Sequence, residues 1–138
     1  MEKKNNFVSF KLQGEMLYIN IENQINPSEK EFNELLEWYR EFFTKIVDFP
    51  FCMIINIENL IMINMRYMMK WAALFKEVND YIEKNVIATS IICSSMVAKS
   101  MMDLFFAFYT PVRPSKIFKP DEDYIKFLKD EYNKYKEN

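Results

Sequence analysis

The chain has 138 residues, a net charge of −2, and a composition in which half of the residues are hydrophobic. This composition excludes disorder, and the length predicts one domain, residues 1–138, that buries about two thirds of its unfolded surface. The near-neutral charge provides no basic surplus for binding phosphate groups. We therefore expect no nucleic-acid partner.

The sequence also bears on location. Its apolar runs are all shorter than the roughly 20 residues that a membrane span requires, and MEKKNNFVSF lacks the apolar core of a signal peptide. We therefore expect no membrane span and a cytoplasmic location. Cys52 and Cys93 lie in apolar runs, which predicts buried thiols rather than a disulfide or a metal pair.

Alternating hydrophobicity predicts a β-hairpin at the N-terminus. Its strands span residues 7–12 and 17–21, and the turn contains Gly14, the only glycine of the chain. A helix is predicted next, with Asn26 as N-cap and Pro27 at the first helical position. Apolar residues at three- and four-residue spacing indicate that this helix is amphipathic.

The rest of the chain alternates strands with helices. The predicted elements are a strand at 51–57, a helix from the Asn64 cap to about 84, a strand at 86–93, a helix from Met96 to about Tyr109 capped by Ser94 or Ser95, a strand at 116–118, and a helix opened by 120–123. The order is ββαβαβαβα. Helical connections between strands imply parallel pairing after the hairpin.

This order resembles the STAS domain, the fold of the SpoIIAA-like anti-sigma factor antagonists and of the cytoplasmic tail of sulfate transporters. The best local match is 53–66, which follows the apolar strand, acidic position, connector and helix start of that family. A weaker match covers 116–124, which is similar to the short last strand and acidic helix cap. The resemblance implies an α/β fold with a mixed, mostly parallel five-stranded sheet and four helices.

The chain departs from the family at the phosphorylation switch. Regulated members carry Asp-Ser-Ser-Gly or Asp-Thr-Ser-Gly at the helix start, whereas this chain has Asn64, Met65, Arg66 and Tyr67. The hydroxyl that would accept the phosphate is absent. The resemblance therefore implies a domain without a serine-phosphorylation switch.

Most catalytic chemistry is excluded by residue type. The chain has no histidine, which removes His-containing triads and His-ligated metal sites, and one glycine cannot form a phosphate-binding loop. Ser94 and Ser95 precede a predicted helix with no base in view, so N-capping explains them. We expect no catalytic residue, no cofactor and no metal, and hence no enzyme.

Apolar surface is the remaining signal. The helix at 96–109 is apolar all round, which is typical of a helix that is fully buried or contacts a partner. We expect Val97, Met101, Leu104, Phe105 and Phe108 to cover the sheet, with Met102, Phe106 and Tyr109 on the opposite face. The alternative is that the last helix or the N-terminal arm covers this second face.

The start of the helix after Asn64 adds Met65, Arg66 and Met69, whose flexible thioethers and charge suit an adaptable contact. The sequence thus predicts a non-enzymatic protein-interaction or regulatory domain, with a protein partner or a homo-oligomer as the assembly. Self-association is the simplest case. The alternative is a carrier that holds a lipid or other apolar small molecule beneath the aromatic helix.

Overall fold

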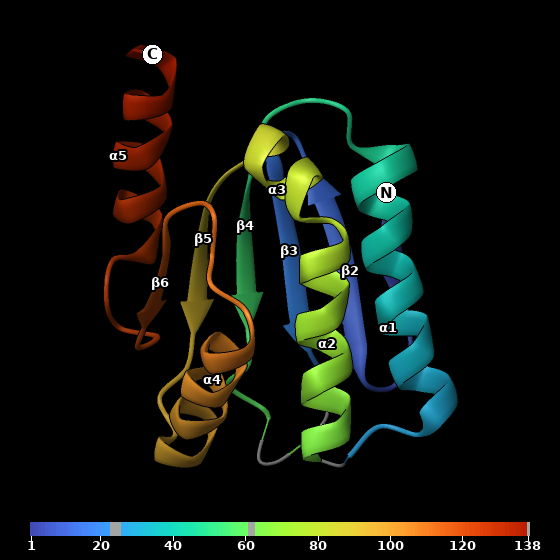
Figure 1. Cartoon of the computed structure of the whole chain (residues 1–138). Coiled ribbons are helices and arrows are strands. Elements are labelled where there is room, and N and C mark those ends of the chain that lie inside the picture. The colour runs from blue at the N-terminus through green and yellow to red at the C-terminus, as the bar shows by residue number, and fades with distance from the viewer. Residues whose placement is uncertain (23–25, 61–62, 138) are drawn as a thin grey trace.

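The computed structural model describes residues 1–22, 26–60 and 63–137. Its strands are β1 (Glu2–Lys4), β2 (Val8–Gln13), β3 (Met16–Ile21), β4 (Phe51–Asn56), β5 (Val86–Ile92) and β6 (Ser115–Phe118). Its helices are α1 (Glu29–Glu41), the π-helical turn η1 (Phe42–Ile46), α2 (Met65–Glu77), α3 (Asn79–Asn85), α4 (Met96–Phe108) and α5 (Tyr124–Glu137). Figure 1 shows their arrangement.

One mixed sheet runs through the molecule in the order β1-β2-β3-β4-β5-β6. The first two pairings are antiparallel and the remaining three are parallel. The hairpin between β2 and β3 turns at Gly14, whose φ of 62° lies in the left-handed region, as the sequence predicted. The α/β class and the mixed, mostly parallel sheet are therefore confirmed, and the described residues form one more strand and one more α-helix than expected.

A row of apolar residues crosses the sheet from β2 to β6. It joins Phe10, Ile19, Ile55, Ile91 and Ile117, each paired with the next across neighbouring strands. All five side chains belong to the larger core cluster or pack against it. Because side chains on a strand alternate between faces, this shared register gives one face of the sheet a continuous apolar surface.

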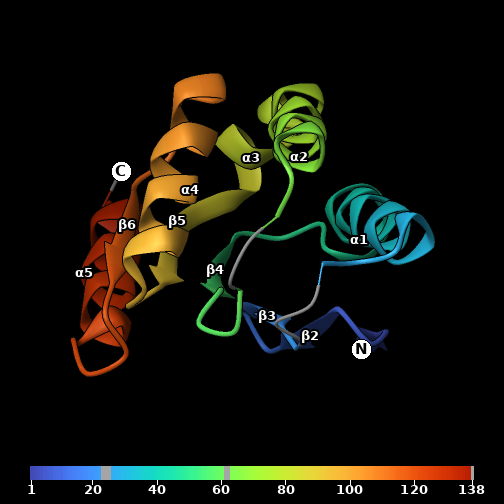
Figure 2. The same cartoon turned by 90° about the horizontal axis from the view of Figure 1, so that it is seen from below.

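The helices cover the two faces unequally (Figure 2). α1, α2 and α4 pack on one face over the larger core, whereas α5 packs on the other through a smaller cluster that includes Cys52, Ile54 and Leu128. Both cysteines are buried and free. On β3, the side chains of Met16, Tyr18 and Asn20 stay partly exposed. None of the described helices is both long and apolar enough to cross a membrane.

Two of the three predicted helix N-caps are confirmed. Asn64 Oδ1 accepts a 2.9 Å hydrogen bond from the Tyr67 N–H, and Ser95 Oγ accepts one of 3.2 Å from the Ala98 N–H. Both residues are therefore the predicted N-caps. The expected N-cap Asn26 is wrong, because Ser28 caps α1 in a reciprocal capping box with Glu31.

Two further differences concern element boundaries. The helix expected from 64 to 84 is divided at Val78, whose φ of −101° and ψ of 19° leave the helical region. The predicted stripe of Met68, Trp71, Ala72, Phe75, Val78 and Ile82 is nevertheless buried on both pieces. Strand β1 was missed, because Glu-Lys-Lys has no apolar alternation and is held by main-chain pairing with β2.

Candidate functional site

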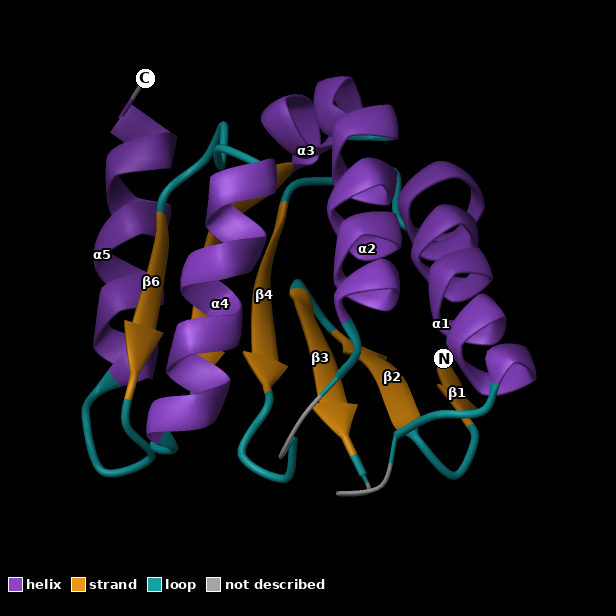
Figure 3. Ribbon diagram, turned by 60° about the horizontal axis from the view of Figure 1, so that its bottom comes forward, coloured by secondary structure: helices purple, strands orange, loops and turns teal. Residues whose placement is uncertain are grey.

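The carboxyl ends of β3 to β6 meet at one edge of the sheet, and α2 and α4 both begin there (Figure 3). In open α/β sheets this edge is where ligands usually bind. We call it the carboxyl edge. Ile61 and Met62, in the connector that leads to α2, lie outside the described residues.

A hydrogen bond joins the loops that follow β4 and β5 at the carboxyl edge. The Ser94 hydroxyl donates a 2.8 Å hydrogen bond to Glu58 Oε2, while Glu58 Oε1 is buried without a hydrogen-bond partner. The expectation that no base lies near Ser94 was therefore wrong, because residues 36 positions apart become neighbours only in the folded sheet. The pair joins two helix-start loops, and no third group of the described chain completes a catalytic relay on it.

The first turns of α2 and α4 expose apolar side chains at this edge. Met65 is 56% exposed, Met69 49%, Met96 78% and Val97 52%. The exposure expected for Met65 and Met69 is thus present. Met96 and Val97 were missed as exposed residues, because the apolar run of α4 gives no periodic signal that separates its inner from its outer side.

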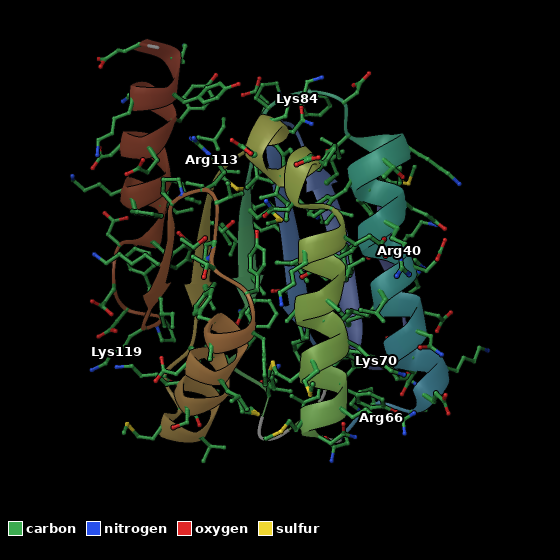
Figure 4. The ribbon with its side chains drawn as sticks, in the orientation of Figure 1. Arg40, Arg66, Lys70, Lys84, Arg113 and Lys119 are labelled. Carbon is green, nitrogen blue, oxygen red and sulfur yellow. The ribbon has the colours of Figure 1, made fainter. Side chains whose placement is uncertain are left out.

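Two cations lie beside the methionines of α2. Arg66 and Lys70 are one helical turn apart, as are Met65 and Met69, so the two pairs form neighbouring rows on the helix. Figure 4 shows Arg66 and Lys70 at the start of α2. Neither cation belongs to any of the ion pairs formed by the described residues. Lys70 was not singled out from the sequence, although its spacing from Arg66 was a usable signal.

The charge at this end of α2 is unusual for a helix start. The N-terminus of a helix carries partial positive charge, which favours acids there by about 0.3–1 kcal/mol each. The first turns of α2 and α4 contain no acid, and α2 has Arg66 instead. The helix dipole and the unpaired cations therefore add up to a positive region surrounded by methionine side chains. We call Met65, Arg66, Met69 and Lys70 the α2 contact surface.

The residues of α4 that were predicted to form an outer apolar face are Met102, Phe106 and Tyr109, and the structure buries them partly or fully. Tyr109 is buried, and its hydroxyl donates a 2.9 Å hydrogen bond to Asn79 Oδ1. Burial raises the pKa of this phenol. Met102 and Phe106 are half-buried and pack against the larger core. The assignment of Tyr109 to an outer face was therefore wrong, as was that of Val97 to the sheet.

An apolar cavity of about 50 Å³ lies under α4 and between it, α2 and the sheet. Its wall includes the three residues just named, Met102, Phe106 and Tyr109, together with Trp71 and Phe75 of α2. These side chains thus face the interior of the molecule. The α4 residues that belong to the larger core or pack against it are Ala98, Met101, Met102, Phe105, Phe106, Phe108 and Tyr109.

Neither cysteine is part of a reactive or metal site at the carboxyl edge. Burial raises the pKa of Cys52 to about 11 and also raises the pKa of the Cys93 thiol. Within residues 1–22, 26–60 and 63–137, no group of three or more Cys, Asp or Glu side chains is arranged to hold a metal ion.

The fold has a counterpart of known structure. An uncharacterised protein of the DUF3478 family from Shewanella loihica PV-4, described as having a SpoIIAA-like fold, superimposes with a TM-score of 0.55 at 11% sequence identity. The match covers 88% of this chain and 91% of that one. No protein-family model and no curated protein matches the sequence. At this identity the likeness concerns the fold alone, and the SpoIIAA-like fold predicted from the sequence is confirmed.

Proposed function

We propose that this chain is a non-enzymatic, intracellular protein-association domain that binds its partner through the α2 contact surface. The observation that carries the proposal is the combination, at one helix start, of two exposed methionines with two unpaired cations. Methionine side chains adapt to different apolar partners, while charges around an apolar contact fix its orientation. The SpoIIAA-like fold supports a regulatory or interaction role of this kind.

The chemistry of the surface favours a partner that combines apolar side chains with carboxylates. A segment that places apolar side chains on Met65 and Met69, with carboxylates next to Arg66 and Lys70, would neutralise the cations at the positive end of the helix. The simplest such partner is a second copy of the chain. We do not include Tyr67 in this contact, because its ring already stacks on that of Phe32, with 4.3 Å between the centroids.

The proposal is tested with the double variant Met65→Glu, Met69→Glu. Light scattering over a range of concentrations measures self-association, and a pull-down from the source cell with tagged protein tests for another partner. We expect the variant to lose the association by at least tenfold, because two apolar contacts are replaced by charge. The matched control is Ala73→Glu, which adds a carboxylate at an exposed position of the same helix.

Two outcomes contradict the proposal. One is a wild-type protein that is monomeric at every concentration and retains no partner in the pull-down. The other is an association that Ala73→Glu weakens as much as the double variant does. The second result would assign the effect to charge on α2 in general rather than to the methionine surface.

A second function, a carrier of an apolar small molecule, is favoured by the cavity beneath α4. With a volume of about 50 Å³ the cavity does not hold a long-chain lipid. A smaller apolar molecule is the better candidate. Native mass spectrometry distinguishes the two functions, because association adds the mass of whole protomers or proteins and a carrier adds the mass of a small molecule.

A further inference from the structure

The cavity beneath α4 is suited to an apolar occupant rather than to water. Met53 and Ile55 of β4 and Phe105 of α4 belong to its wall, which is mainly aliphatic and aromatic. A bound water needs two to four polar partners, and the part of the wall that these three side chains form supplies none. Apolar cavities in protein cores stay dry, and one of about 150 Å³ in another protein binds benzene or xenon.

The outer wall of the cavity contains its most adaptable side chains. Met102 and Phe106 both line the cavity, and both are half-buried, whereas the β4 side of the wall is buried in the sheet. Methionine has three rotatable bonds and repacks readily. A ligand larger than the present free volume therefore gains room by displacing these two side chains outward, without breaking the pairing of the sheet.

One end of the cavity is charged. Arg113, from the connection between α4 and β6, lines the cavity and also a neighbouring polar groove of about 620 Å³ that contains Lys134, Tyr135 and Lys136. Figure 4 shows Arg113 at the end of the sheet opposite Arg66. Arg113 therefore lies at the boundary between the apolar cavity and a groove that is open to solvent.

The guanidinium of Arg113 is held in place but keeps donors for a ligand. Nε donates to the Val86 carbonyl at 3.1 Å and Nη2 to the Ile87 carbonyl at 3.2 Å, and the group lies 5.9 Å from the centre of the Tyr135 ring. A guanidinium has five N–H donors, so three remain. Among the described residues no carboxylate forms an ion pair with Arg113, and Glu131 in the groove pairs with Lys134 instead.

We propose that the cavity and Arg113 form one binding site for a small apolar monocarboxylate. The apolar part of the ligand lies beneath α4, and its carboxylate accepts hydrogen bonds from Arg113 at the boundary with the groove. Arginine is the residue best matched to a carboxylate, because its planar donors contact both oxygens. This inference rests on the second proposed function, the carrier, and adds the chemical class of the ligand.

The test compares 4-phenylbutyrate with 4-phenylbutanol, which has the same ring and chain length but no charge. Each is titrated into protein labelled with ¹³C at the methionine methyl groups and followed by NMR. Met53, Met68 and Met102 line the cavity, whereas Met65, Met69 and Met96 are exposed at the carboxyl edge and serve as internal controls. We expect saturable shifts in the first group only, with the acid binding at least tenfold more tightly than the alcohol.

Three variants separate the parts of the site. Arg113→Gln should reduce the affinity for the acid to that for the alcohol, a loss of at least tenfold, while the affinity for the alcohol stays within twofold. Arg113→Lys, which keeps the charge, should retain a preference for the acid. Val112→Phe, which adds a ring at a half-buried position of the cavity wall, should weaken both ligands together. Circular dichroism checks that each variant is folded.

The possible failures are distinguishable. Equal affinity of the wild type for acid and alcohol, with shifts at the cavity methionines, would overturn the role of Arg113 and leave the carrier function standing. Shifts confined to the exposed methionines would show surface binding only. That result, or the absence of any saturable shift up to the solubility limit of both ligands, would overturn the site and the carrier function together.

Discussion

The hydroxyl of Ser94 donates a 2.8 Å hydrogen bond to Glu58 Oε2 and so joins the loops that follow β5 and β4. This bond is the only one formed by the Glu58 carboxylate among the described residues, since Oε1 is buried without a partner. A carboxylate that is partly removed from water depends strongly on its remaining hydrogen bonds. We therefore expect the stability of the two loops at the carboxyl edge to depend on this hydrogen bond.

We predict that Ser94→Ala destabilises the protein by about 1–2 kcal/mol, because it leaves both oxygens of Glu58 without a protein donor. Urea denaturation measures the effect. Ser100→Ala makes the same change at an exposed position of α4 and should be neutral or slightly stabilising, since alanine is the better helix former. Equal free energies of unfolding for the two variants would show that the Ser94–Glu58 bond does not contribute in solution.

The start of α1 gives a second prediction. Ser28 Oγ accepts a 3.1 Å hydrogen bond from the Glu31 N–H, and Glu31 Oε1 accepts one of 2.9 Å from the Ser28 N–H. Removing such a cap typically costs about 1 kcal/mol, so Ser28→Ala should lower the free energy of unfolding by about this amount. Asn26→Ala should change it by less than about 0.5 kcal/mol. The reverse order of the two variants would restore Asn26 as the functional cap.

A third prediction concerns alkaline pH. Burial raises the pKa of Cys52 to about 11 and raises the pKa of Tyr109 above its usual range. An acid whose pKa is higher in the folded state keeps its proton there while the unfolded chain releases it. Unfolding is then favoured as pH rises, so the contribution is complete below about pH 8.5, where unfolded cysteine begins to ionise, and is lost above it.

The measurement is a series of urea denaturation curves from pH 7 to pH 11. We expect stability to fall as pH rises above about 8.5, and Cys52→Ser to reduce the fall at its lower end. In the native protein at pH 8, a pKa of about 11 leaves about one thiol in a thousand ionised, so a thiol reagent should label Cys52 far more slowly than in the unfolded chain. Rapid labelling of native Cys52 would contradict its burial.

The position of a helical residue can be predicted where polar residues alternate with apolar ones. The stripe from Met68 to Ile82 was identified correctly, because polar residues such as Lys70 and Glu77 separate its apolar positions. Helix α4 has few polar residues, so several rotations about its axis fit the sequence equally well. The predicted rotation placed Val97 inward and Tyr109 outward, whereas Val97 is exposed and Tyr109 is buried. Met101, Phe105 and Phe108 contact the core as predicted.

The candidate site was predictable only in part. Met65, Arg66 and Met69 follow an identifiable helix start, so their exposure was accessible from local pattern alone. The Ser94–Glu58 bond and the cavity bounded by Arg113 depend on contacts between segments that are distant in the sequence. Such contacts are set by strand register and by the rotation of helices, which periodicity does not specify.

The last prediction uses charge to distinguish an inward from an outward position. Phe106 is half-buried, lines the cavity and lies with its ring 5.6 Å from that of Phe105. Phe106→Glu should therefore lower the free energy of unfolding by about 2–4 kcal/mol, through lost apolar burial and a partly desolvated carboxylate. Met65→Glu, at the start of α2, should change it by less than about 0.5 kcal/mol, because Met65 is exposed and an acid is favourable there.

Thermal and urea denaturation measure both variants, and light scattering reports their association. If Phe106 is an interior residue, its variant loses stability first and association only as a consequence, whereas Met65→Glu loses association at full stability. A Phe106→Glu protein that is as stable as the wild type, but smaller in mass by light scattering, would return Phe106 to an outer contact face. In that case the inner wall of the cavity beneath α4 would have to be formed by Phe105 and Tyr109 without it.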